Sequence, residues 1–150
     1  MRRWTTSIAL LLFALVVCAA AKDESLAELK ARFERARPED RPEIAIKIAQ
    51  NQLRNADKLY NDGKEFEARD AVTDIVAYSE KASEAAQQTK KRLKNVEIDV
   101  RKMADKLRDI KRNLAFEDQP AVDQAVHRLE DMRTKLLNEM FAKEEKKDKK

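Results

Sequence analysis

Glycine, proline, cysteine and aromatic residues are all scarce in this chain. Its 150 residues include one glycine, three prolines and one cysteine, and 5% of them are aromatic. Such a composition, rich instead in alanine, leucine and charged residues, is typical of long helices and coiled coils rather than of sheets. A charged fraction of 40% also leaves little material for a broad core. We therefore expect an all-α protein, built as an elongated antiparallel helical bundle.

Residue patterns that support catalysis or metal binding are missing as well. The sequence has no glycine-rich phosphate loop and no nucleophile placed beside a base. The only histidine, His127, has Asp123 and Asp131 four residues away on either side, so the three side chains share one helical face. They do not complete a transition-metal site, because no second histidine accompanies them. We interpret them as solvated residues and expect no enzyme activity, cofactor or metal.

The first 21 residues form a candidate export signal. Two arginines precede an uncharged, largely apolar stretch over residues 4–21, which ends in three alanines. This order is that of a secretory signal peptide, with cleavage expected after Ala21. Two alternatives stay open: residues 15–18 resemble a bacterial lipobox, which would attach lipid to Cys18, and an uncleaved stretch just reaches the length of a membrane anchor. The sequence predicts a periplasmic or secreted protein, or one anchored by this segment.

Cleavage would remove several residue types completely. Cys18 is the only cysteine and Trp4 the only tryptophan, so the mature chain would contain neither. Its stability would then depend on helix packing, because no disulfide could form. Loss of the two arginines would also lower the formal net charge from +4 to +2, a weak field for attracting polyanions.

Apolar periodicity divides the remainder of the chain into helices. Two prolines at positions 38 and 42 force the first turn, and Gly63 suits a left-handed cap at the second. Residues 22–143 are expected to form one elongated helical domain, and residues 144–150 a disordered charged tail. The expected helices cover about residues 24–36, 42–60, 64–115 and 118–143.

The segment over residues 64–115 is the most informative. No glycine or proline interrupts it, and its apolar positions follow alternating steps of three and four residues. We expect one central helix of about 50 residues, roughly 75 Å long. Its seam consists of Val72, Ile75, Ser79, Ala82, Ala86, Thr89, Leu93, Val96, Val100, Met103, Leu107, Ile110 and Leu114.

The residues that flank this seam predict the neighbours of the central helix. Apolar flanks before about residue 88 widen the stripe enough for two helices, 24–36 and 42–60, whereas charged flanks after it suit the single helix 118–143. The short connection favours this pairing within a monomer over a coiled-coil dimer. Leu137 and Phe141 are then expected to meet the turn over residues 38–42. Ile98 lies outside the seam, and these three residues are the candidate partner contacts.

Residues 59–68, Leu-Tyr-Asn-Asp-Gly-Lys-Glu-Phe-Glu-Ala, resemble the turn in the middle of a tetratricopeptide helical hairpin. In that family a glycine is followed by an aromatic residue and then by an alanine that allows close helix packing. The resemblance covers one copy, whereas a solenoid needs about three. A solitary helical hairpin accounts for the same residues. The functional implication of the resemblance is peptide or protein binding.

Basic clusters occur at residues 90–94 and 108–112, but acidic residues are interleaved and no aromatic residue is available for base stacking. We therefore expect no nucleic-acid binding. The export signal and the long helix together predict a non-enzymatic interaction or scaffold protein of the cell envelope or secreted fraction, with an unidentified protein partner. The alternative is a holdase-like periplasmic chaperone that binds unfolded clients.

Overall fold

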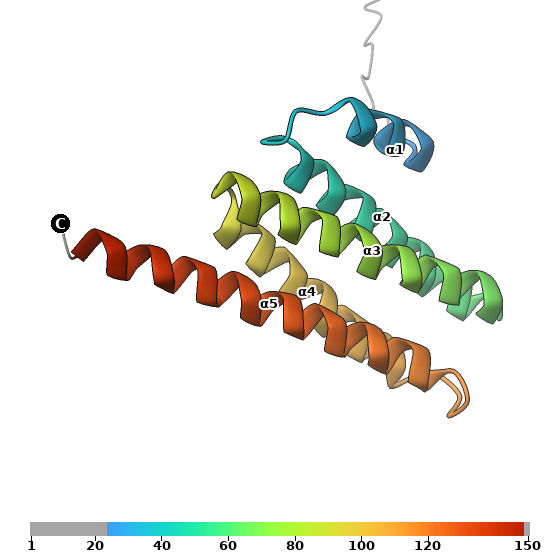
Figure 1. Cartoon of the computed structure of the whole chain (residues 1–150). Coiled ribbons are helices and arrows are strands. Elements are labelled where there is room, and N and C mark those ends of the chain that lie inside the picture. Colours follow the sequence, from blue (N-terminus) through green and yellow to red (C-terminus); the bar gives the residue numbers. More distant parts are fainter. Residues whose placement is uncertain (1–23, 149–150) are drawn as a thin grey trace, which may run out of the picture.

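The structure, a computed structural model, describes residues 24–148, and its regular secondary structure in that range is entirely α-helical (Figure 1). The expected all-α class is therefore confirmed. The candidate signal over residues 1–21, including Cys18, lies outside the described residues. None of the helices within residues 24–148 is long and apolar enough to cross a membrane. The helices are α1 (Leu26–Arg35), α2 (Arg41–Asn61), α3 (Glu65–Thr89), α4 (Leu93–Lys111) and α5 (Gln119–Asp148).

Local signals account for the first two helices. α1 begins at a capping box, in which the N–H of Glu28 donates to Ser25 Oγ and the N–H of Ser25 donates to Glu28 Oε2. Pro42 lies in the first turn of α2, where a missing N–H breaks no helical hydrogen bond. Gly63 follows α2 with a φ of +69°. A Cβ at that position would meet only Glu65 Oε1, at an ordinary contact distance of 4.0 Å, so the left-handed backbone is what favours glycine there.

The expected central helix over residues 64–115 is wrong. Its first part ends at Thr89 and a new helix starts at Leu93, because Lys90 and Arg92 adopt left-handed φ angles of 55° and 61°. No local signal accounts for this turn, since lysine and arginine are good helix formers. Tertiary packing explains the turn. In a straight helix, residues 93–111 would pack against one neighbouring helix, whereas the folded-back α4 packs against α2, α3 and α5. Folding back therefore buries more apolar surface.

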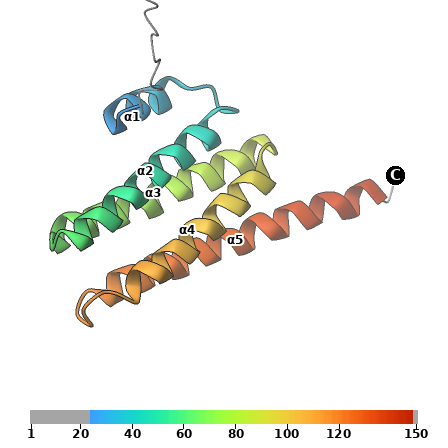
Figure 2. The same ribbon diagram turned by 180° about the vertical axis from the view of Figure 1, so that it is seen from behind.

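Two antiparallel hairpins, α2–α3 and α4–α5, pack together into a four-helix bundle (Figures 1 and 2). Between the hairpins α3 packs against α5, α2 against α4, and α3 against α4. The turns of both hairpins lie at one end of the bundle, and the α3–α4 turn lies at the other. α1 packs on α2 beside the first hairpin, and its Phe33 ring meets Tyr78 of α3 edge-on at 5.9 Å.

This arrangement confirms part of the expected pairing. Helix α4, which corresponds to the second half of the predicted central helix, packs on the C-terminal helix α5 as expected. The expectation that the helices over residues 42–60 and 118–143 would pack along opposite halves of one central helix is wrong, because α2 and α5 run along the same bundle without packing on each other. Helix α5 also continues to Asp148, past the boundary expected at residue 143.

The core coincides with the predicted apolar seams. The small residues Ser79, Ala82 and Ala86 are fully buried, which allows close packing around α3. Leu114 is half-buried at the end of the seam. The seam positions of α4 are all buried, namely Leu93, Val96, Val100, Met103, Leu107 and Ile110. Those of α5 that face them are buried too, namely Val122, Ala125, Leu129, Met132 and Leu136.

Candidate partner-binding surface

Two phenylalanines are exposed at the end of the bundle that carries the hairpin turns. Phe66 lies in the first turn of α3, just after the α2–α3 turn, and its exposed fraction is 79%. Phe116 lies in the connection between α4 and α5, and 85% of it is exposed. We call this end, with Phe66 and Phe116, the turn-end surface. Both residues stand outside the apolar seams and contribute little to the core.

An ion pair between the hairpins ties the two halves of the turn-end surface together. Arg69 Nη2 of α3 donates to Asp118 Oδ1, just before α5, over 2.6 Å. The Asp118 side chain is only 10% exposed, so this carboxylate depends on its partner. The Arg69 guanidinium also lies 5.8 Å from the centre of the Phe66 ring. The position of Phe66 is therefore coupled to the segment that carries Phe116.

A half-buried tyrosine, Tyr60, lies near this ion pair. Burial raises the pKa of Tyr60, and the nearby Asp118 carboxylate raises it further. Its hydroxyl is buried and has no hydrogen-bond partner among the described residues. Tyr60 is therefore a neutral packing residue under the turn-end surface, and the surface itself is formed by the side chains around it.

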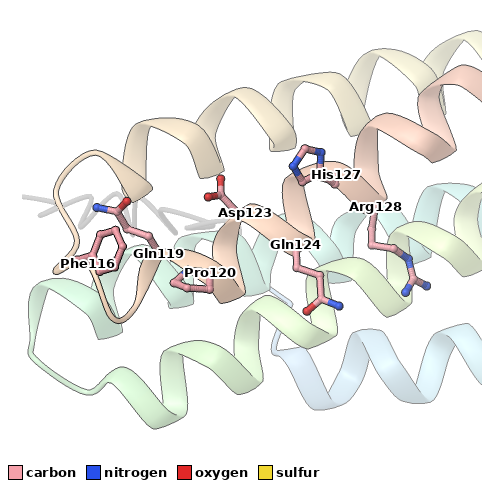
Figure 3. Close-up of a pocket in the computed structure, with 7 residues that line it drawn as sticks. All are labelled: Phe116, Gln119, Pro120, Asp123, Gln124, His127 and Arg128. Atoms are coloured by element: carbon pink, nitrogen blue, oxygen red, sulfur yellow. The ribbon is translucent and has the colours of Figure 1, made fainter.

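An open pocket of about 500 Å³ extends from Phe116 along the exposed side of α5 (Figure 3). Gln119 and Pro120 begin the helix beside the phenylalanine, and the pocket continues past Asp123 to His127 and Arg128. Apolar atoms make up most of its exposed lining. A projecting side chain of a protein partner would fit beside the ring.

The charged residues in this pocket are engaged in ion pairs between helices. Lys111 Nζ of α4 donates to Asp123 Oδ1 over 2.6 Å, and Arg128 pairs with Glu80 of α3. His127 is exposed on the same side of α5. Within residues 24–148, no group of three residues is placed to hold a metal ion. Of the two aspartates beside His127, Asp131 is exposed, whereas Asp123 is half-buried and paired with Lys111.

The structure does not bring the sequence-predicted contact residues together. Ile98 is half-buried on α4, and Leu137 is half-buried on α5. Phe141 is 61% exposed and lies two residues after Glu139, which pairs with Lys90 at the α3–α4 turn. Helix α5 packs on neither α1 nor α2, and the expected meeting of Leu137 and Phe141 with the turn over residues 38–42 stays a prediction. Residue 18, the candidate lipidation site, lies outside the described range.

The basic cluster at the α3–α4 turn is also paired with acids. Lys90 pairs with Glu139 of α5, Lys91 with Glu39, and Arg92 with Glu43 of α2. The last two contacts each span 2.8 Å. These pairs connect the turn to three other segments of the chain. The positive charges of the cluster are therefore compensated by acidic residues of the same chain.

Sequence reasoning missed Phe66 and Phe116 as surface residues. A signal was present, since both are large apolar residues that stand off the heptad seam beside a turn. The sequence does not indicate that the two residues lie at the same end of the bundle, because this depends on how the two hairpins pack together. Comparison with known proteins found no matching family model, no matching curated protein and no matching solved structure.

Proposed function

We propose that this chain is an exported, non-enzymatic helical interaction protein that binds a protein partner through the turn-end surface. The observation that supports the proposal is the placement of two largely exposed phenylalanines, Phe66 and Phe116, at one end of the bundle. A single exposed apolar residue is ordinary on a soluble protein. Two aromatic residues on segments that the Arg69–Asp118 pair joins are of the residue type that often anchors protein interfaces.

The surroundings of these rings suit a protein rather than a polyanion. The pocket beside Phe116 accepts an apolar side chain, and Arg69 and Arg128 lie close enough to donate to a partner's carbonyl or carboxylate groups. Each arginine already has an acidic partner, which limits the local positive field. A rigid spacer function is not part of the proposal, because residues 64–115 form two helices that fold back on each other.

The export part of the proposal rests on residues 1–21. Their charged start, apolar middle and small-residue end remain those of a signal peptide, and cleavage after Ala21 remains the favoured outcome over lipidation of Cys18 or retention as an anchor. The proposed location is therefore the periplasm or the secreted fraction.

Crosslinking in the native envelope tests the partner. We expect the wild-type chain to yield one stoichiometric crosslinked protein, and Phe66→Ser with Phe116→Ser to abolish it without loss of helical content. Phe141→Ser is the matched control, because Phe141 is also exposed but lies away from the turn-end surface. Equal crosslinking by the double variant and the wild type would contradict the proposal.

A holdase-like chaperone is the second candidate. The observation that favours it is the exposure of Phe141 in addition to the other two phenylalanines, because clients bind to apolar surface spread over a chaperone. Suppression of aggregation of a model client by substoichiometric protein would support this function, with all three phenylalanines contributing. An interaction protein of the first type is expected to leave client aggregation unchanged.

A further inference from the structure

The turn between α3 and α4, residues 90–92, is short and locally strained. Lys90 and Arg92 have φ angles of 55° and 61°, in the left-handed region that side chains with a Cβ disfavour. Glycine and asparagine are the usual residues there, and this turn contains neither. Lysine and arginine instead favour a continuing helix. We call residues 90–92 the hinge. The intrinsic preference of these residues is for a continuous helix, whereas the fold requires a bend.

The apolar seam passes through the hinge without a change of phase. In α3 the buried Ala82 and Ala86 are followed by the half-buried Thr89, and in α4 the buried Leu93 and Val96 continue the same steps of three and four residues. A bend between unrelated helices would not need to preserve this spacing. A straightened hinge would therefore produce one helix with a single continuous seam.

We propose that the chain also forms a domain-swapped dimer with a second copy of itself. In this dimer the hinge is straight, α3 and α4 form one helix, and the α4–α5 hairpin of one protomer packs on the α2–α3 hairpin of the other. Each interface between the hairpins is then rebuilt between chains, including the packing of α3 on α5 and of α2 on α4. The ion pairs Arg69–Asp118 and Lys106–Asp57 reform in the same way.

Few stabilising interactions of the monomer are lost in the domain-swapped dimer. The contacts that depend on the bent hinge are the pairs of Lys90, Lys91 and Arg92 with acidic residues, and their side chains are 31–57% exposed. Exposed pairs of this type contribute little to stability. In the dimer, Lys90 and Arg92 of each chain no longer adopt left-handed φ angles, which relieves backbone strain. The opposing factor is the entropy of joining two chains, so the monomer dominates at low concentration and the dimer gains with concentration.

Mixed-chain energy transfer detects the swap directly. Full-length chains with Cys18→Ser carry a donor on Glu67→Cys or an acceptor on Glu117→Cys, both at exposed positions near the hairpin turns. The two samples are mixed, unfolded and refolded at about 1 mM, comparable with the effective concentration within one chain. Dimers are then separated by size exclusion with light scattering. We expect energy transfer within them, because swapping places the donor of one chain beside the acceptor of the other.

Hinge substitutions should move the dimer-to-monomer ratio in opposite directions. Lys90→Val with Arg92→Val should raise it at least about tenfold, because β-branched residues tolerate the left-handed region worst. Lys90→Gly with Arg92→Gly should lower it by a similar factor. The control, Lys94→Gly with Arg101→Gly, weakens α4 at exposed positions outside the hinge in both forms, and should leave the ratio unchanged.

Several results would overturn the proposal. These are dimers without energy transfer, wild-type and valine chains that both remain monomeric, or a glycine variant that dimerises as readily as the wild type. Helical circular dichroism is recorded first for each variant. If the valine variant does not fold, the comparison of the wild type with the glycine variant decides. The assay contains no other protein, so its outcome is independent of the partner proposed for the turn-end surface.

Discussion

Asp99 is the carboxylate whose environment disfavours its charge most clearly. It is half-buried on α4, and this burial raises its pKa, only partly opposed by Lys102. Asp99 lies seven residues after Arg92, which precedes α4, and seven residues before Lys106 of α4. Those two residues pair with Glu43 and Asp57 of α2 over 2.8 Å. Asp99 itself has no ion pair among the described residues, so its charged form lacks the compensation that its neighbours have.

We predict that Asp99→Asn stabilises the fold at neutral pH. Because the folded-state pKa is raised, the folded chain binds more protons than the unfolded chain between the two pKa values, and stability falls as the pH rises through that interval. The substitution should therefore raise the free energy of unfolding at about pH 7 and leave it unchanged at about pH 3, measured by urea denaturation. Asp70→Asn, at an exposed position on α3, is the control. A loss of stability at pH 7 would contradict this explanation.

Val100 tests the seam between α4 and α5. It is fully buried at a seam position, so Val100→Asp places a carboxylate where no partner is available. We expect a loss of about 2–5 kcal/mol in the free energy of unfolding, with loosening of α5 in hydrogen exchange. Arg101→Asp, on the exposed side of the same helix, should cost less than about 1 kcal/mol. Equal effects of the two substitutions would show that the assigned seam is wrong.

At the level of helices, Arg69 and Asp118 connect the two hairpins. Arg69→Ala leaves the largely buried Asp118 carboxylate without its partner, and we expect a loss of about 1–3 kcal/mol in urea denaturation. The matched control is Arg112→Ala, which removes an exposed pair with Asp109 within one helical turn and should cost about 0.5 kcal/mol or less. An equally small effect at Arg69 would mean that the hairpins do not depend on this contact.

The sequence predicted helices well wherever a local signal marked their ends. Pro42 and Gly63 delimit α2 in the structure, and the heptad seam of α4 is buried as its spacing indicated. The hinge was not predictable in this way, because Lys90–Arg92 contain no residue that favours a turn. Its bend comes from packing between helices that are distant in sequence. The turn-end surface follows from that bend, so it was beyond sequence reasoning even though each phenylalanine was visible.

At the scale of the whole molecule, the N-terminal segment predicts where the protein is located. Residues 1–21 fused to a reporter should direct it across the inner membrane, because two arginines followed by an apolar stretch suffice for this routing. Exported protein should show tyrosine fluorescence only, since cleavage removes Trp4, the only tryptophan. A reporter retained in the cytoplasm would contradict export, and tryptophan emission from exported protein would contradict cleavage.

Both hairpin turns share one end of the bundle, which places Phe66 and Phe116 on one surface. The distance between spin labels at Glu67→Cys and Glu117→Cys, on the Cys18→Ser background, tests it most directly in the monomer at low concentration. The bundle predicts a distance within about two helix diameters, roughly 25 Å, because the Arg69–Asp118 ion pair joins the segments that carry both positions. A distance near 75 Å, the length of 50 residues in one continuous helix, would contradict the account.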